Sequence, residues 1–327
     1  MRNLITGGAG FVGSHLSEYL LSKGHEVYVL DNLSTGAITN LDGCKDHENF
    51  HYVTGDALET TQLPELVDRC DRIFHLAAAV GVRLIVEEPV HTIETNISGT
   101  ETILRLAAKK RKPVLITSTS ECYGKASKIP FSEDDDMVLG PTSTARWAYA
   151  ASKAVDEFLA LAYYREKGLP TVVVRLFNTV GPRQTGQYGM VIPNFVCQAL
   201  SGKPITVYGD GKQSRCLGYV GDVVPALVAL MDTPACHGQV FNIGNDKEIS
   251  IEDLAKKIRD KIDPSLEIQF IPYDKAYGKG FEDMQRRVPD LSKVRGAVGY
   301  NPSTSVDEII DLVIQHFRTH EQDRITV

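Results

Sequence analysis

A glycine-rich turn near the N-terminus constrains the fold of this chain more than any other feature. Thr6 ends a short apolar segment, and the run from Gly7 to Gly13 follows it directly and opens a helical stretch. Glycines in such a turn let the backbone approach a pyrophosphate and let the helix pack close to the strand, while the helix N-terminus supplies N–H donors. The order of strand, turn and helix therefore predicts a dinucleotide-binding unit.

The rest of the first half repeats this rhythm of strand and helix. Segments rich in Val, Ile, Leu or Phe alternate with longer helical segments, and most of them lack the polar alternation of half-exposed strands. Continuous apolar runs are typical of parallel strands that are covered on both faces, so the fold class predicted is α/β, a Rossmann doubly wound parallel sheet. The predicted strands are Arg2–Thr6, Glu26–Asp31, Phe50–Asp56, Arg72–Ala78, Pro113–Ser118 and Thr171–Asn178, and the predicted helices are Phe11–Lys23, Val90–Lys110 and Trp147–Lys167.

The pattern changes after Asn178. Segments interrupted by glycine and proline separate shorter elements, with one further buried strand at Val240–Ile243. A length of 327 residues suggests two domains of ordinary size. We expect an NAD-binding Rossmann domain over residues 1–178, with contributions from about 220–245. Residues 179–327 are expected to form a smaller C-terminal substrate-binding lobe over the carboxyl edge of the sheet, where open α/β folds bind ligands.

Composition limits the partners of the chain. The formal net charge of −7 argues against nucleic acid or an anionic membrane as the main partner. Six cysteines are scattered without a CxxC pair or metal-like spacing, which indicates reduced, mostly buried thiols and no metal site. The glycine turn leaves no room for a signal peptide, and no apolar stretch approaches the roughly 18 residues that span a bilayer. We therefore expect a cytoplasmic protein.

Two aspartates at predicted strand ends indicate the cofactor. Asp31 ends the second strand, where a carboxylate can accept hydrogen bonds from both hydroxyls of an adenosine ribose. An acid at this position repels a 2′-phosphate, so NAD is favoured over NADP. Asp56 ends the third strand and is a candidate for the adenine edge, with a capping or surface role as the alternative.

Tyr149 and Lys153 indicate the chemistry. They begin a long predicted helix, and their i, i+4 spacing places both on one face. An ammonium beside a phenol, with a nicotinamide cation nearby, lowers the pKa of the tyrosine, so that a phenolate can act as a base near neutral pH. A surface pair on a helix is the alternative, but the preceding glycine turn and Asp31 favour a dehydrogenase base.

Five sequence blocks resemble the extended short-chain dehydrogenases/reductases, which include nucleotide-sugar epimerases, dehydratases and decarboxylases. The blocks are Gly7–Gly13, His75–Ala78, Thr117–Gly124, Tyr149 with Lys153, and Arg175–Asn178, in that order over essentially the whole chain. The resemblance implies a UDP-linked sugar as substrate and a homodimer formed by the helices at Val90–Lys110 and Trp147–Lys167, although their apolar faces could equally be buried core.

The same resemblance implies the site residues. His75, which closes the fourth strand, is expected to be a core histidine. The implied cofactor contacts are Gly7, Gly10, Phe11, Val12, Gly13, Asp31, Asn32, Asp56, Ala57, Leu76, Ala77, Ala78, Asn96, Thr117, Tyr149 and Lys153, and the implied substrate contacts are Thr119, Tyr149, Asn178, Arg183, Val191, Arg215 and Arg287.

Glu121 distinguishes between the reactions of this family. Thr119 is positioned to bind the sugar 4-hydroxyl and relay its proton to Tyr149, whereas typical 4-epimerases carry a small or hydroxyl residue at the position of Glu121. A carboxylate there resembles the branch that does chemistry at C5, namely 4,6-dehydratases and UDP-glucuronate decarboxylases. Ser120 stands where glucose-type dehydratases usually have an aspartate, which weakens that option, although mannose-type dehydratases also have Thr-Ser-Glu here.

Arg287 favours decarboxylation. The segments Arg146–Tyr149, Tyr277–Gly280 and Arg287–Pro289 resemble the decarboxylase of the 4-amino-arabinose pathway, whose matching arginine handles the carboxylate or donates a proton. A guanidinium suits a uronate carboxylate, with a diphosphate contact as the alternative. The predicted function is therefore an NAD-dependent UDP-glucuronate decarboxylase that uses Thr119, Glu121, Tyr149, Lys153 and Arg287.

Other functions stay open. A UDP-sugar 4-epimerase is the second hypothesis, and a nucleotide-sugar 4,6-dehydratase is the third. A non-catalytic relative that senses NAD would typically lose the pair Tyr149 and Lys153, and both residues are present.

Overall fold

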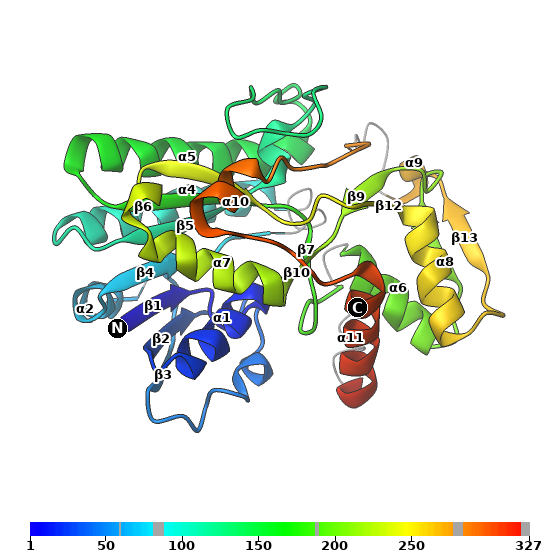
Figure 1. Cartoon of the computed structure of the whole chain (residues 1–327), viewed down its shortest axis with the longest axis horizontal. Helices are drawn as coiled ribbons and strands as arrows, with labels where there is room; N and C mark the ends of the chain where they lie inside the picture. The colour runs from blue at the N-terminus through cyan, green and yellow to red at the C-terminus, as the bar shows by residue number, and fades with distance from the viewer. Residues whose placement is uncertain (59, 81–87, 187–189, 277–283, 322–327) are drawn as a thin grey trace.

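Seven parallel strands form the central sheet, and helices cover both of its faces (Figure 1). The computed structural model describes residues 1–58, 60–80, 88–186, 190–276 and 284–321. The strand order β11-β6-β5-β4-β1-β2-β3 reverses direction between β1 and β4, which is the point where doubly wound sheets bind ligands. The strands are β1 Arg2–Thr6, β2 Glu26–Asp31, β3 Phe50–Thr54, β4 Arg72–His75, β5 Val114–Thr119, β6 Thr171–Leu176 and β11 Gln239–Ile243. The predicted α/β class and the Rossmann sheet are confirmed.

The apolar strands are explained by burial on both faces of the sheet. Successive side chains of a strand point to opposite faces, so Leu4 and Leu30 pack in one core while Ile5 and Val29 pack in the other. The first core lies beneath α2 Leu63–Arg69, α4 Pro89–Ala108 and α5 Ala148–Lys167, and the second lies beneath α1 Phe11–Ser22, α7 Val220–Asp232 and α10 Ser292–Val298.

A third core holds the smaller lobe together, at the right of Figure 1. Apolar faces of α6 Val191–Leu200, α8 Ile251–Ile262 and α11 Val306–Thr319 meet there with β8 Ile205–Tyr208 and β13 Ile268–Ile271, which pair in parallel. Short pairings join β7 Thr179–Val180 to β10 Gly218–Tyr219 and β9 Ser214–Cys216 to β12 Glu248–Ser250. The remaining elements are α9 Tyr273–Ala276 and the 3₁₀ turns η1 Ile38–Leu41, η2 Ser120–Tyr123, η3 Ala145–Trp147 and η4 Pro234–Cys236.

The chain returns from the lobe to the sheet. β11 adds the edge strand beside β6, α7 packs against α1, and α10 packs against β11 and α7. The α10 segment lies inside the range 179–327 that the sequence assigned to the lobe, so the residues that build the sheet layer extend beyond 220–245.

All six cysteines are buried, and none forms a disulfide in the described part of the chain. No helix among the described residues is both long and apolar enough to span a membrane. The same residues contain no cluster of three or more His, Cys, Asp or Glu side chains arranged to hold a metal ion.

Candidate active site

One cavity of about 980 Å³ lies along the carboxyl ends of the strands and reaches into the lobe. The residues that follow β1, β2, β4, β5 and β6 line it on the sheet side, and segments of α6, β8 and β9 line it on the lobe side. Every predicted site residue lines this cavity except Asn96 and Lys153. Tertiary folding thus brings nearly all of them to one place.

The glycine turn forms the cavity wall below α1. Gly7 adopts a φ of +73°, and a Cβ there would lie 2.7 Å from the Ala77 nitrogen. A Cβ on Gly13 would overlap the carbonyl oxygen of Gly7. No side chain caps α1, whose N-cap is Gly10, so its first N–H groups stand beside the cavity that Phe11, Val12 and Gly13 line. This arrangement suits a pyrophosphate.

Asp31 is fixed next to that turn. Its Oδ2 accepts a hydrogen bond from the backbone N–H of Ala9 at 2.9 Å, and its Oδ1 accepts one from Leu33 at 2.8 Å. Burial raises the pKa of Asp31, while these backbone hydrogen bonds lower it. Each carboxylate oxygen has two lone pairs, so the oxygens can also accept from ribose hydroxyls.

A second polar edge lies beside Asp31. The Asn32 amide donates to Asp56 Oδ2 at 2.8 Å, and Asp56 Oδ1 accepts from the Leu58 N–H at 2.7 Å. Both side chains line the cavity with Ala57. The adenine contact of Asp56 stays a prediction.

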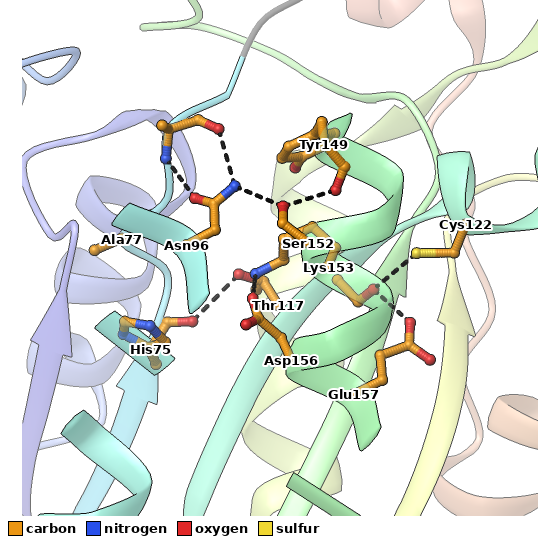
Figure 2. Close-up of polar contacts among 12 residues, drawn as sticks. His75, Ala77, Asn96, Thr117, Cys122, Tyr149, Ser152, Lys153, Asp156 and Glu157 are labelled. Carbon is orange, nitrogen blue, oxygen red and sulfur yellow. Dashed lines mark hydrogen bonds and ion pairs between the residues drawn. The ribbon is translucent and has the colours of Figure 1, made fainter. Parts of the chain in front are cut away.

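Asn96 lies behind the cavity wall. Figure 2 shows its side chain bridging the loop after β4 to α5: Oδ1 accepts from the Ala79 N–H at 2.8 Å, and Nδ2 donates to Ser152 Oγ at 3.2 Å. Ser152 in turn donates to the carbonyl of Tyr149 at 2.9 Å. Asn96 therefore does not line the cavity, its amide fixes the loop and the start of α5, and its contact with the cofactor stays a prediction.

Tyr149 lies on the first turn of α5, lines the cavity and is 8% exposed. Burial raises the pKa of Tyr149, and Glu121, Cys122 and Asp156 raise it further, while the hydroxyl of Thr119 lowers it. The Lys153 ammonium is bound to Asp156, with Nζ 2.8 Å from Oδ2. The expectation that Lys153 and a bound nicotinamide lower the pKa of Tyr149 stays a prediction.

Glu121 is held by two arginines from different segments. Arg146 Nη1 donates to Oε2, and Arg287 Nη1 lies 3.4 Å from Oε1. All three side chains line the cavity together with Thr119 and Tyr149. Sequence reasoning identified Glu121 and Arg287 but did not select Arg146. Its position three residues before Tyr149, one turn away, was the available signal. Residues 277–283, which carry part of the resemblance around Arg287, lie outside the described residues.

Two arginines among the predicted substrate contacts form different hydrogen bonds. Arg183 donates to both carboxylate oxygens of Glu18, at 2.9 and 2.7 Å, and to the Asn40 carbonyl at 2.9 Å, which ties the loop after β7 to α1. Arg215, on β9, donates to the carbonyl of Ser214 at 2.8 Å and is 7% exposed. Both line the cavity with Asn178 and Val191, and their contacts with a substrate stay predictions.

Comparisons with known proteins agree with this geometry. The family model described as GDP-mannose 4,6 dehydratase matches residues 4–313. A UDP-N-acetyl-alpha-D-glucosaminuronate decarboxylase of Bacillus cytotoxicus is 43% identical over 98% of this chain and 99% of its own. UDP-glucuronic acid decarboxylase 1 of Xenopus tropicalis is 38% identical over 97% of this chain and 72% of its own.

Solved structures show the same architecture. UDP-glucuronic acid 4-epimerase from Bacillus cereus, in complex with UDP-glucuronic acid and NAD, is similar with a TM-score of 0.87 and 28% identity over 98% of this chain and 99% of its own. UDP-glucose 4-epimerase from Thermotoga maritima, with UDP-glucose, has a TM-score of 0.87 and 30% identity over 98% and 100%.

Proposed function

The chain belongs to the GDP-mannose 4,6-dehydratase family of extended short-chain dehydrogenases/reductases, and from this premise we propose that it is an NAD-dependent UDP-glucuronate decarboxylase. The observation that carries the proposal is the contact of Glu121 with Arg146 and Arg287 beside Tyr149. Guanidinium groups recognise carboxylates by charge and paired hydrogen bonds, which suits a uronate. The two relatives named above are decarboxylases of UDP-linked uronates.

The residues around the glycine turn fit NAD. A Cβ at Gly7 or Gly13 would collide with the backbone of Ala77 or of Gly7, so only glycines allow this tight turn at the start of α1, where N–H groups suit a pyrophosphate. Asp31 suits ribose hydroxyls and disfavours a 2′-phosphate. When bound there, NAD supplies the acceptor and later the donor of a hydride at C4 of the sugar.

Tyr149 and Thr119 handle the proton of the 4-hydroxyl. Thr119 accepts from the N–H of Glu121 at 3.2 Å, which fixes its hydroxyl beside Tyr149 at the cavity wall. Tyr149, as phenolate, takes the proton from the 4-hydroxyl and returns it to the oxygen when C4 is reduced again. This needs a lower pKa for the phenol than burial alone gives, so a cation near Tyr149 is required in the working state.

The carboxylate leaves after C4 becomes a ketone. The uronate is then a β-keto acid, so the C5–C6 bond breaks with release of CO₂, and its electron pair forms an enolate across C4 and C5. Arg287 and Arg146 hold the carboxylate and balance its charge, and the pair Arg287 and Glu121 governs proton delivery to C5. Return of the hydride to C4 gives UDP-xylose.

A second candidate substrate is UDP-N-acetylglucosaminuronate. It is favoured by the 43% identity to the Bacillus cytotoxicus relative, and its chemistry at C4 and C5 is the same. Epimerisation at C4 is less well supported, because a ketone made and reduced again needs no acid or base at C5 and leaves Glu121 with Arg287 without a role.

The test is a product analysis with NAD⁺ and one sugar at a time. UDP-glucuronate, UDP-N-acetylglucosaminuronate and UDP-glucose are incubated separately with the protein, and CO₂ release and NMR spectra are recorded. We expect CO₂ and a UDP-pentose from at least one uronate and no product from UDP-glucose. If UDP-glucuronate gives UDP-galacturonate and neither uronate releases CO₂, the protein is an epimerase and the proposal is wrong.

We also propose a homodimer through α4 and α5, which pack against each other along one face of the molecule. Exposed apolar side chains on these helices include Val90 at 67% and Ile93 at 38% on α4, and Val155 at 40% and Phe158 at 65% on α5. Within each helix the pair is three residues apart, so it shares a face. Exposed apolar side chains gathered on neighbouring helices are typical of an interface between protein chains.

Replacing Phe158 by aspartate is therefore expected to give a monomer. In a two-fold interface the introduced aspartate faces the same aspartate of the second subunit, and the two negative charges repel each other. Size-exclusion chromatography with light scattering should therefore report half the wild-type mass. The matched control is Phe270→Asp, on the lobe strand β13 and 48% exposed, which should stay dimeric. A wild-type protein that is already monomeric would contradict this assembly.

A further inference from the structure

Lys153 and Asp156 form a fully buried ion pair on α5. Nζ of Lys153 lies 2.8 Å from Oδ2 of Asp156, and their side chains are 2% and 0% exposed (Figure 2). The pair lies one turn beyond Tyr149 and does not line the cavity. The ammonium that should support the phenolate is therefore bound by a carboxylate on its own helix.

Burial of the Asp156 carboxylate is unfavourable for the free energy of folding. Within the described part of the chain, its Oδ1 has no hydrogen-bond partner. Burial raises the pKa of Asp156, although the charge of Lys153 lowers it. A buried ion pair is weak evidence for stability, because an apolar pair of similar volume often serves the fold as well. The position therefore calls for a role other than packing.

We propose that Asp156 is a positioning residue that keeps Lys153 charged and placed below Tyr149, so that the proton of the Tyr149–Lys153 pair stays on the lysine when the phenolate forms. The inference rests on the proposed function in one respect, that Tyr149 is the base. A buried lysine without a counter-ion readily loses its proton, and a neutral amine would no longer stabilise a phenolate.

Other charged and titratable groups on neighbouring elements lie around the Lys153–Asp156 pair and contribute to its electrostatic environment. His75 faces it from β4, and burial together with the charge of Lys153 lowers its pKa to about 3, so this imidazole is neutral. The other groups are Glu121 and Cys122 after β5, Arg146 on η3, Glu157 on α5 and Arg175 on β6, where the last two bind each other.

The sign of the effect follows from charge. In the proposed mechanism the active form of the Tyr149–Lys153 pair has lost one proton, so that the phenolate stands beside the ammonium. Removing the negative charge of Asp156 makes that first proton easier to lose from either group, so the acidic limb of the pH profile moves to lower pH. Asp156 contacts Lys153 rather than Tyr149. Its removal therefore moves the one proton that is left on the pair from the lysine to the tyrosine, which lowers the fraction of molecules with a phenolate.

The decisive variant is Asp156→Asn, measured as kcat against pH with the UDP-uronate that the wild type decarboxylates. We expect kcat at its maximum to fall about tenfold while the acidic limb moves down by roughly one pH unit. Loss of packing alone would lower stability or kcat without moving the limb. An acidic limb that stays in place or moves to higher pH would overturn the proposal.

Two further variants separate the effect of the charge at position 156 from an effect on folding. Asp156→Glu retains the charge and should retain the position of the limb, and Asp156→Ser replaces Asp156→Asn if the latter does not fold. The matched control is Glu157→Gln, which removes the neighbouring buried carboxylate that binds Arg175 and should leave the limb in place.

A readout without turnover separates this inference from the proposed function. With NAD⁺ bound and no sugar, the tyrosinate absorbance near 295 nm is titrated and compared with that of Tyr149→Phe. In Asp156→Asn the ionisation of the pair should begin at lower pH and yield less tyrosinate at a given degree of deprotonation. If no uronate is decarboxylated but this shift appears, the reaction is assigned wrongly and Asp156 still positions Lys153. Identical titrations in variant and wild type would refute the role of Asp156.

Discussion

Phenylalanine in place of Tyr149 is expected to lower kcat for CO₂ release by about 10³-fold, because the first step loses its proton acceptor. The phenol oxygen is the only atom removed, and the ring stays packed at the start of α5. C4 cannot be oxidised unless the 4-hydroxyl proton leaves, so NADH formation in a single turnover should fall by the same factor as CO₂ release. Stopped-flow absorbance at 340 nm and CO₂ capture measure the two.

A second tyrosine offers a matched control. Tyr123 is fully buried, donates to Asn242 Oδ1 at 2.8 Å and does not line the cavity. Tyr123→Phe should lower the free energy of unfolding by about 1 kcal/mol and leave kcat within a few-fold. If Tyr149→Phe retains decarboxylation at a comparable level, the base is a different group and the mechanism above is wrong.

Glutamine in place of Glu121 is expected to lower CO₂ release by about 10²-fold while hydride transfer at C4 persists. Arg146 and Arg287 each contact one oxygen of this carboxylate. An amide replaces one of these oxygens by an NH₂ group, which cannot accept a hydrogen bond from an arginine. The effect should therefore fall on C5. A 4-keto sugar and NADH should accumulate, and mass spectrometry with absorbance at 340 nm detects both.

Ser120 supplies the control for Glu121. This serine precedes Glu121 on η2, is 1% exposed and lines the same cavity. Ser120→Ala should keep most of the decarboxylation if Glu121 is the group that works at C5. Equal losses of NADH formation and CO₂ release in Glu121→Gln would instead place Glu121 at the C4 step.

Much of the fold could be predicted because its signals are local. The glycine turn specifies a backbone path that side chains would block, as the overlap of a Gly13 Cβ with the Gly7 carbonyl shows. Apolar runs such as those in β1 and β2 specify burial on both faces of a sheet. Because the carboxyl ends of parallel strands share an edge, the sequence was enough to predict that Asp31 and Thr119 line one cavity.

The finer assignment of the site needed tertiary structure. The resemblance implies a cofactor contact for Asn96 but not the hydrogen bonds to Ala79 and Ser152 that its amide forms where α4 packs against α5. The i, i+4 spacing placed Tyr149 and Lys153 on one face, yet it could not show that Lys153 turns toward Asp156, because a lysine has four rotatable bonds and takes the rotamer that its nearest counter-ion stabilises.

The sequence by itself determined the backbone plan, the nucleotide-binding edge and the residue types available for proton transfer, since each depends on neighbours within one or two turns of chain. Tertiary structure alone decided which charges meet. Arg287 reaches Glu121 across 166 residues, and Arg146 joins them from the turn before α5. Such contacts depend on how whole elements pack and on which side-chain rotamers that packing permits, and no local pattern encodes either.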